Sequence, residues 1–191
     1  PHWMTRAVLH EVGARVDRQV LATGLLELLA TVEAVLPDLR NCRHRIQAFD
    51  KKVGDRRVRV AGQGDDSHSG DYLLLIDAGG SDRYENVGPM PAYATVSVVI
   101  DLDGDDVVQW DSVPGPGAGV LGTGLWIDVA GNDRYRGGKY GNGSALLGAG
   151  LHWDMQGNDS YSGNAGVQGA GNYGLGILLD SEGDDSYLAY L

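Results

Sequence analysis

The 191-residue sequence has little cysteine, little proline and no long apolar run, and each shortage excludes a class of protein. Cys42 is the only cysteine, which rules out an intramolecular disulfide framework and a zinc site built from several cysteines. Proline occurs 6 times and glycine follows no three-residue period, so the chain is not collagen-like. No apolar stretch approaches the roughly 18 residues that a membrane span requires. We therefore expect no membrane span.

Basic residues are scarce beyond residue 59. Residues 1–59 contain 11 Lys and Arg against 7 Asp and Glu, and residues 60–191 contain 4 against 19. The two parts carry +4 and −15, which sum to the net charge of −11. An acidic surface repels nucleic-acid phosphates and attracts cations. We expect metal ions among the partners and no nucleic acid.

The first segment, residues 1–54, has the pattern of an amphipathic helix. Apolar residues recur at spacings of three and four from residue 5 to residue 36, as in one helix or in two helices joined near Gly24. Pro37 predicts a stop, followed by a shorter helical stretch that reaches Phe49. Because so short a segment buries little apolar surface by itself, we expect its apolar stripe to pack on the next domain or on a second copy of the chain.

The second segment, residues 55–191, repeats a nine-residue motif. Five copies share the form D-x-x-G-[SND]-D-x-[YV]-x and start 24, 27, 26 and 26 residues apart. Gly64 to His68 forms a degenerate earlier copy, and a short apolar triplet precedes each full copy. Repeats of this length are typical of solenoid rungs. The sequence predicts a mainly β fold, a right-handed parallel β-solenoid (β-helix) preceded by an α-helical N-terminal segment.

Period-two alternation gives each position of a rung an expected direction. The first and third residues of an apolar triplet are predicted to point inward and the middle residue to be more exposed, which places Trp126 and His152 on the outer face. Glycines that align in the last three rungs predict tight corners. The motif tyrosines are predicted to form a packed column, with a sugar-stacking surface as the alternative: Tyr84, Tyr135, Tyr161 and Tyr187.

The aspartates of the motif carry the chemistry of the repeat. Parallel rungs lie about 4.8 Å apart, so equivalent aspartates are expected to stack into two columns. Carboxylates about 5 Å apart repel by roughly 3 kcal/mol at an effective dielectric constant of 20, and solvent, turn amides or bound cations must relieve this repulsion. Hard oxygen ligands without His or Cys suit Ca²⁺. The candidate metal ligands are Asp77, Asp82, Asp101, Asp103, Asp106, Asp128, Asp133, Asp154, Asp159, Asp180 and Asp185.

The motif resembles the nonapeptide G-G-x-G-x-D-x-U-x of RTX (repeats-in-toxin) proteins, whose six-residue turns bind Ca²⁺ in a parallel β-roll. The fourth, sixth and eighth positions match, as in Gly131, Asp133 and Tyr135. Two features depart from the RTX pattern, since the first position is Asp and each rung contains one motif. By this resemblance the metal-binding position is taken by Asp82, Asp106, Asp133, Asp159 and Asp185.

The acidic turns leave two interpretations open. They bind Ca²⁺, or they are metal-free turns in which Asp and Asn side chains accept hydrogen bonds from nearby amides and Asn132 and Asn158 stack as an amide ladder.

Three functions are compatible with the repeat. The first is a calcium-binding structural or binding module without catalysis of its own, placed outside the cell or at its surface if calcium is bound. The second is a polysaccharide-acting β-helix enzyme, by analogy of fold. The third is a metal-free self-assembly module, completed by a second copy at the helical segment or at the open solenoid end. Repetition favours the first, because a catalytic site is singular and these carboxylates recur in every rung.

Overall fold

The computed structural model describes residues 6–88, 96–111 and 114–190. Helices α1 (Arg6–Gly13) and α2 (Arg18–Cys42) come first and are followed by the 3-10 turn η1 (Arg43–Arg45). Asp17 caps α2, because its Oδ1 accepts hydrogen bonds from the backbone N–H groups of Gln19 (2.9 Å) and Val20 (3.2 Å). The two helices therefore separate at residues 14–17, and α2 continues through Gly24.

The prediction that the helix stops at Pro37 is wrong. Pro37 lies inside α2, which continues to Cys42, and the helical stretch predicted to reach Phe49 ends with η1, because Phe49 begins a β-strand. Proline removes one backbone hydrogen bond from a helix interior. Leu36 and Leu39 on either side of it pack against the β-sheet, so tertiary contacts hold both sides of the interruption in helical form.

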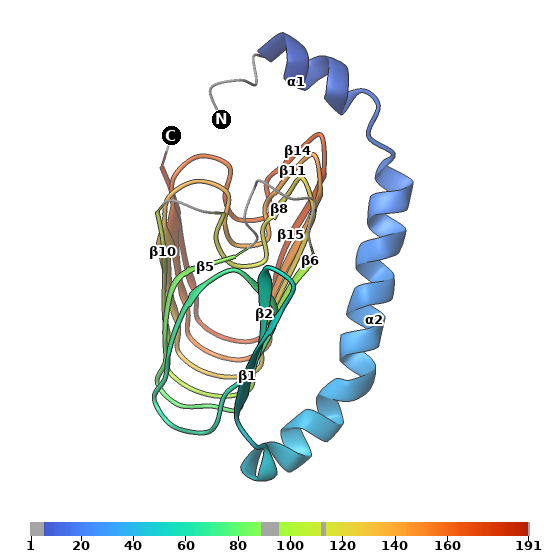
Figure 1. The fold of residues 1–191 in the computed structure, drawn as a ribbon. Coiled ribbons are helices and arrows are strands. Elements are labelled where there is room, and N and C mark those ends of the chain that lie inside the picture. Colours follow the sequence, from blue (N-terminus) through green and yellow to red (C-terminus); the bar gives the residue numbers. More distant parts are fainter. Residues whose placement is uncertain (1–5, 89–95, 112–113, 191) are drawn as a thin grey trace.

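Three sheets form the β-rich part of the molecule (Figure 1). Sheet A contains β1 (Phe49–Val53), β2 (Arg56–Val60), β4 (Tyr72–Asp77), β6 (Val96–Asp101), β9 (Thr123–Asp128), β12 (Ala149–Asp154) and β15 (Leu175–Asp180). Sheet B contains β3 (Ser67–Gly70), β5 (Arg83–Val87), β7 (Val107–Trp110), β10 (Arg134–Gly137), β13 (Ser160–Gly163) and β16 (Ser186–Ala189). Sheet C contains β8 (Gly119–Val120), β11 (Ala145–Leu146) and β14 (Gly171–Asn172).

Each rung contributes one strand to sheet A and one to sheet B, and later rungs add a strand in sheet C. Neighbouring rungs pair in parallel and in register, with Leu125 opposite Val98 and Tyr135 opposite Tyr161. The described strands deviate from this pattern in the first rungs: β1 and β2 pair antiparallel, and the register shifts by a residue within the β2–β4 and β3–β5 pairs. The prediction of a parallel β-solenoid preceded by a helical segment is confirmed, although β1 lies within residues 1–54.

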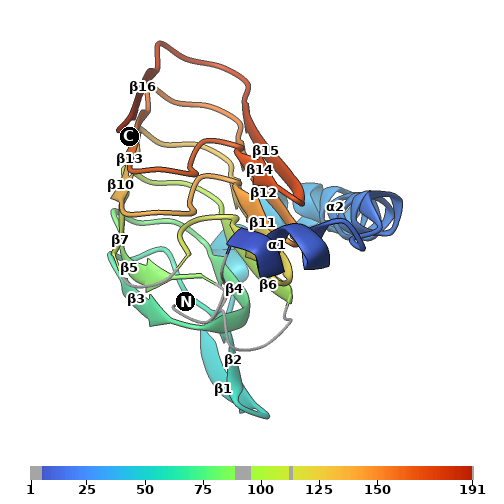
Figure 2. The ribbon, with the colours of Figure 1, turned by 90° about the horizontal axis from the view of Figure 1, so that it is seen from above.

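Helix α2 covers the outer face of sheet A (Figures 1 and 2). Leu25, Val32 and Leu36 of α2 are buried in one hydrophobic cluster with the outward residues of β6, β9 and β12. The apolar stripe of the helical segment was expected to pack on the next domain or on a second copy, and it packs on the next domain. By length and composition alone, the stretch Arg18–Arg45 is also apolar enough to cross a membrane, a test that core helices pass too. The expectation of no membrane span stays a prediction.

The apolar triplets face the opposite way to the prediction. Their middle residues, among them Val99 and Trp126, lie inside the solenoid with the motif tyrosines. Their first and third residues, such as Leu125 and Ile127, point outward and pack under α2. The alternation rule gives the wrong direction because both faces of sheet A are covered, one by the solenoid interior and the other by the helix.

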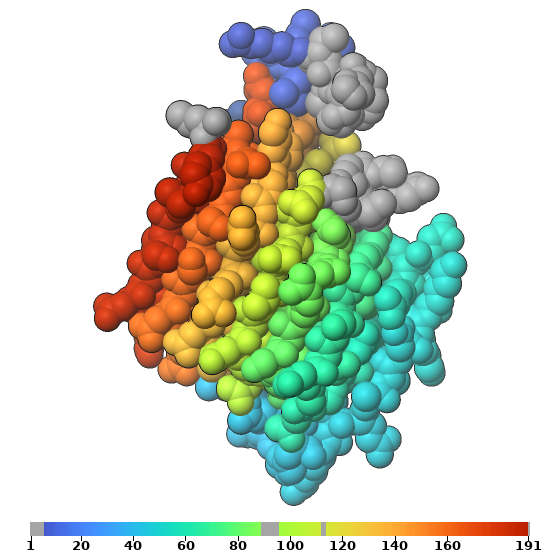
Figure 3. Space-filling model, turned by 90° about the vertical axis from the view of Figure 1, so that its left-hand side faces the viewer, coloured from blue at the N-terminus to red at the C-terminus, as the bar shows by residue number. Residues whose placement is uncertain are grey.

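The outer face of sheet B is built differently. Figure 3 looks onto this face, where successive rungs follow one another as parallel stripes from the N-terminal to the C-terminal end. Outward residues there include Arg83, Glu85 and Arg134, which are exposed, whereas Tyr84 and Tyr135 between them are completely buried. Sheet B thus alternates polar outward residues with apolar inward ones, as expected for a sheet with one solvated face.

Candidate metal centres

Two columns of aspartates flank the corner between sheets A and B. The first column, at motif position one, ends the strands of sheet A, and register pairs Asp77 with Asp101, Asp101 with Asp128, Asp128 with Asp154 and Asp154 with Asp180. The second column, at position six, comes directly before the strands of sheet B. The stacking predicted from the repeat is therefore confirmed for both columns.

The second column is held by a ladder of backbone hydrogen bonds. The backbone N–H of Asp82 donates to Oδ1 of Asp106 (2.7 Å), and that of Asp106 donates to Oδ1 of Asp133 (2.7 Å). The same bond joins Asp133 to Asp159 (2.7 Å) and Asp159 to Asp185 (2.8 Å). Each carboxylate thus holds its turn to the preceding rung, which satisfies a buried amide and leaves one carboxylate oxygen over.

A second ladder runs beside it at motif position five, in the opposite direction along the stack. Asn132 donates its backbone N–H to Oδ1 of Asp105 (2.9 Å), and Asn158 donates to Oδ1 of Asn132 (3.1 Å). The side-chain amides of Asn158 and Asn132 are also bonded (3.2 Å), so the predicted amide ladder is confirmed. Because this ladder is exposed, its charges are solvated.

Tyrosine hydroxyls bond the first column. Tyr135 donates to Oδ2 of Asp128 (2.7 Å), and Tyr161 donates to Oδ2 of Asp154 (2.8 Å). The rings themselves stack, with 4.9 Å between the centroids of Tyr135 and Tyr161, so the packed column is confirmed as well. Sequence reasoning missed the hydroxyl contacts, because an apolar role explained every tyrosine of the motif.

Glycine at motif position four lets the rungs approach. A Cβ built on Gly104 would lie 1.5 Å from the carbonyl oxygen of Gly80, and Gly104 has φ +146°. A Cβ on Gly131 would likewise lie 1.9 Å from the carbonyl oxygen of Gly104. A side chain here would separate the rungs, and with them the aspartate columns.

The stacked carboxylates are buried and keep oxygens without partners. Asp77, Asp101, Asp128 and Asp154 are no more than 1% exposed. In the described residues, hydrogen-bond partners are lacking for Oδ2 of the second column and Oδ1 of two members of the first: Asp82, Asp106, Asp133, Asp159, Asp128 and Asp154. Polar atoms buried in this way are rare in proteins, and each is an available ligand atom.

These oxygens converge in five clusters along the stack. Within each cluster the candidate ligand atoms of three residues lie within 4.8 Å of one another. Four clusters contain carboxylates only: Asp82, Asp101 and Asp106; Asp106, Asp128 and Asp133; Asp133, Asp154 and Asp159; Asp159, Asp180 and Asp185. The fifth contains His68, Asp77 and Asp82. A cation in a cluster would join two successive rungs.

Burial changes the proton affinity of these groups. Removal from water raises the pKa of Asp82 to about 7 and the pKa of Asp133 to about 8, and the charges of neighbouring aspartates add to the rise. Burial raises the pKa of Asp128 well above its ordinary value. Without a cation, the fold therefore retains protons at neutral pH.

Ten of the eleven predicted ligands fall within the clusters. The exception, Asp103, forms an ion pair with Arg43 of η1 at 2.5 Å and lies in none of them. Sequence reasoning missed His68. In the structure β3 pairs His68 with Tyr84, so His68 stands at the position of the motif tyrosines, and that alignment could have marked it.

Trp126 and His152 lie inside the solenoid, and the prediction that they face outward is wrong. His152 is completely buried, its ring lies 4.6 Å from that of Tyr135, and burial lowers its pKa to about 3. It is therefore a neutral part of the aromatic interior.

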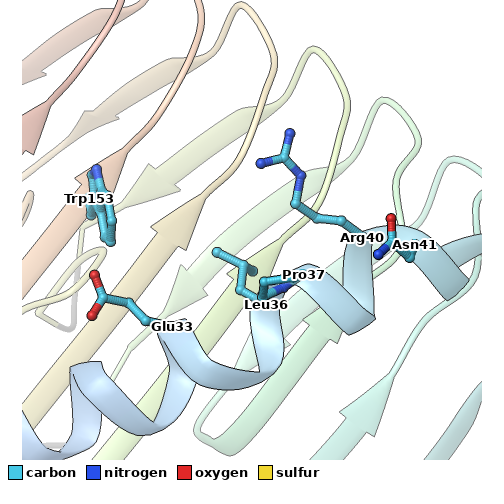
Figure 4. A pocket seen from close by; sticks show the side chains of 6 residues that line it. All are labelled: Glu33, Leu36, Pro37, Arg40, Asn41 and Trp153. Atoms are coloured by element: carbon cyan, nitrogen blue, oxygen red, sulfur yellow. The ribbon is translucent and has the colours of Figure 1, made fainter.

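A groove of about 560 Å³ lies between α2 and sheet A (Figure 4). It is lined by Glu33, Leu36, Pro37, Arg40, Asn41 and Trp153. Among these residues Glu33 is the only carboxylate, whereas a glycoside-hydrolysing site needs two.

Comparison of the chain with models of protein families, with curated proteins and with solved structures gave no match. The function of the chain must therefore be inferred from the chemistry of the clusters.

Proposed function

We propose that this solenoid is a calcium-binding structural or binding module, in which Ca²⁺ occupies the acidic clusters and joins successive rungs. The observation that carries the proposal is the set of buried carboxylate oxygens without partners, such as Oδ2 of Asp106 and Oδ2 of Asp133. The other oxygen of each accepts a backbone N–H from the preceding rung, so the free oxygens already have the orientation that a shared cation needs.

The electrostatic cost of the stack supports a bound cation. When ionised, carboxylates about 5 Å apart repel by roughly 3 kcal/mol at an effective dielectric constant of 20, and without a cation burial makes several of these groups keep protons instead. A divalent cation shared by two rungs replaces this repulsion with attraction. Its binding energy then adds to the free energy of unfolding, since the unfolded chain does not hold three carboxylates together.

Oxygen ligands in irregular geometry favour Ca²⁺ over Mg²⁺. Ca²⁺ accepts six to eight oxygens in flexible arrangements, whereas Mg²⁺ demands octahedral geometry and loses its waters reluctantly. The resemblance of the motif to RTX nonapeptides supports the same ion. Extracellular calcium modules bind at millimolar to submillimolar concentrations, so a calcium-bound solenoid of this kind fits a place outside the cell.

Thermal unfolding with and without calcium tests the proposal. Metal-stripped protein is expected to melt well below the calcium-loaded protein, and Mg²⁺ at equal ionic strength is expected to restore little of the difference. Elemental analysis of the purified protein should find calcium. An unchanged melting temperature together with an absence of bound metal would overturn the proposal and leave the metal-free module.

A further inference from the structure

The first of the five clusters differs from the others in its donors, and we propose that it binds Zn²⁺ instead of Ca²⁺. Its members are His68, Asp77 and Asp82. Nε2 of His68 lies 2.6 Å from Oδ2 of Asp77, and both side chains are completely shielded from solvent. The inference rests on the proposed function only in requiring that divalent cations reach the solenoid interior.

His68 occupies the place of a motif tyrosine. Strand β3 pairs in register with β5, so His68 lies opposite Tyr84, and the two rings stack with 4.7 Å between their centroids. In the next rung the hydroxyl of Tyr84 bonds Asp101 in the same way. The first rung thus replaces a hydroxyl with an imidazole nitrogen and keeps the packing of the column.

Each aspartate of this cluster uses one oxygen to accept a backbone N–H and keeps its second oxygen off the backbone. Oδ1 of Asp77 accepts the backbone N–H of Gly79 (3.0 Å), and its Oδ2 faces His68. Oδ1 of Asp82 accepts the backbone N–H of Asp66 (2.5 Å). Oδ2 of Asp82 has no partner, and Asp82 is 2% exposed. This buried, unpartnered oxygen is the second sign of a ligand, independent of the histidine.

The donor set selects the metal. Imidazole nitrogen suits Zn²⁺ and related transition ions, whereas Ca²⁺ takes oxygen ligands. Zinc binds nitrogen and carboxylate oxygen at about 2.0–2.2 Å in a tetrahedron, which places its ligand atoms about 3.4 Å apart. The three donors lie within 4.8 Å of one another, so side-chain rotations that separate Nε2 of His68 from Oδ2 of Asp77, now 2.6 Å apart, would supply three of the four ligands. The four carboxylate-only clusters lack the nitrogen donor and stay calcium sites.

Cobalt spectroscopy tests the assignment, because Co²⁺ substitutes for Zn²⁺ and its visible d–d bands report the ligand set. Metal-stripped protein is titrated with Co²⁺ in excess Ca²⁺. We expect visible bands that one equivalent of Zn²⁺ abolishes. The variant H68Y, which restores the residue of the other rungs, should lose the bands and bind Zn²⁺ more than about tenfold more weakly. The variant D159N, whose two clusters share no residue with this one, should keep the bands.

The alternative is that His68 only donates a hydrogen bond to Asp77. Absence of cobalt bands in the wild-type protein, or their persistence in H68Y and in a second variant H68Q, would overturn the inference. Calcium-dependent melting of H68Y reports on the proposed function separately. If H68Y loses the cobalt bands and keeps its stabilisation by calcium, both proposals stand; cobalt bands without calcium stabilisation would leave only the zinc site.

Discussion

The solenoid turns its chain at two kinds of corner, and they depend on different chemistry. At the corner between sheets A and B, aspartate side chains bond the amides of neighbouring rungs, as Asp133 bonds the N–H of Asp106. At the corners around sheet C, glycines bring backbones together, as at Gly143, where a Cβ would lie 1.7 Å from the carbonyl oxygen of Ile177. We name these the acidic corner and the glycine corner.

The two corners differ in whether their contribution to stability depends on pH and on bound cations. The glycine corner contains backbone contacts and left-handed residues such as Leu121 and Leu147, which occupy equivalent places in successive rungs. Steric fit of this kind does not respond to pH or metal. The acidic corner concentrates buried carboxylates, so its contribution changes with the protons or cations that neutralise them.

The largest effect is expected at the glycine corner. Gly143 has φ +73° and no room for a Cβ, so Gly143→Ala should lower the free energy of unfolding by about 3 kcal/mol or more. The loss should be equal in calcium and in chelator, as measured by urea denaturation. Gly62→Ala is the control, because nothing lies within 4 Å of its Cβ position. A loss that depends on calcium would mean that the corners are not independent.

The second-largest expected effect is the change in stability of the metal-free protein with pH. Burial raises the pKa of Asp82 to about 7 and the pKa of Asp133 to about 8, against an unfolded value near 3.8. Between these values the folded state binds more protons than the unfolded state, so stability should fall as pH rises from about 4 to 8. The melting temperature of metal-stripped protein across this range checks the sign.

Saturating calcium should reverse that trend. Because Ca²⁺ binds deprotonated carboxylates, protons compete with it, and stability should then rise with pH. Gly143→Ala should shift both curves downward without changing their slopes. A metal-stripped protein whose melting temperature rises with pH would contradict the burial argument.

A matched pair of neighbouring residues tests the acidic corner directly. Asp106 belongs to two clusters, whereas Asp105 lies in the exposed ladder at a place that Asn132 and Asn158 occupy in later rungs. Asp106→Asn keeps the Oδ1 acceptor but removes a charged ligand, so it should reduce the calcium-induced rise in melting temperature. In chelator it should change stability little, because burial raises the pKa of Asp106 to about 11 and the carboxyl that is replaced is already uncharged at neutral pH.

Asp105→Asn makes the same change of charge outside the clusters. It should alter stability by less than about 0.5 kcal/mol in either condition, as surface substitutions usually do. Equal responses of the two variants to calcium would show that the ions bind by general attraction to an acidic surface instead of in the clusters.

The two corners also differ in how far the sequence predicts them. The spacing of Asp77, Asp101 and Asp128 was enough to predict the columns, because parallel in-register pairing fixes which residues stack. The direction of each apolar triplet was not predictable, since α2 makes both faces of sheet A apolar. His68 was missed because the first rung lacks the leading aspartate that defines the motif, although the degenerate copy already aligned His68 with Tyr84, as strand pairing does.

The smallest effects concern the tyrosine hydroxyls of the acidic corner. Tyr135 is completely buried, donates its hydroxyl proton to Asp128 and has its hydroxyl oxygen 3.2 Å from Oδ2 of Asp154, whereas Tyr187 is 49% exposed and donates to Asp180 of the last described rung. Tyr135→Phe removes a hydrogen bond to a buried carboxylate and should cost about 1.5–3 kcal/mol, and Tyr187→Phe should cost less than about 1 kcal/mol.

The two tyrosine variants are most informative when their stabilities are compared in calcium and in chelator. A cation on the free Oδ1 of Asp128 would replace the proton that this buried carboxyl keeps without metal and change the charge on Oδ2, the oxygen that the hydroxyl bonds, so the cost of Tyr135→Phe should differ between calcium and chelator. Urea denaturation of both variants in the two conditions measures the difference. A cost of Tyr135→Phe that is the same in both conditions would show that no cation binds the carboxyl of Asp128, and would count against the clusters as the calcium sites.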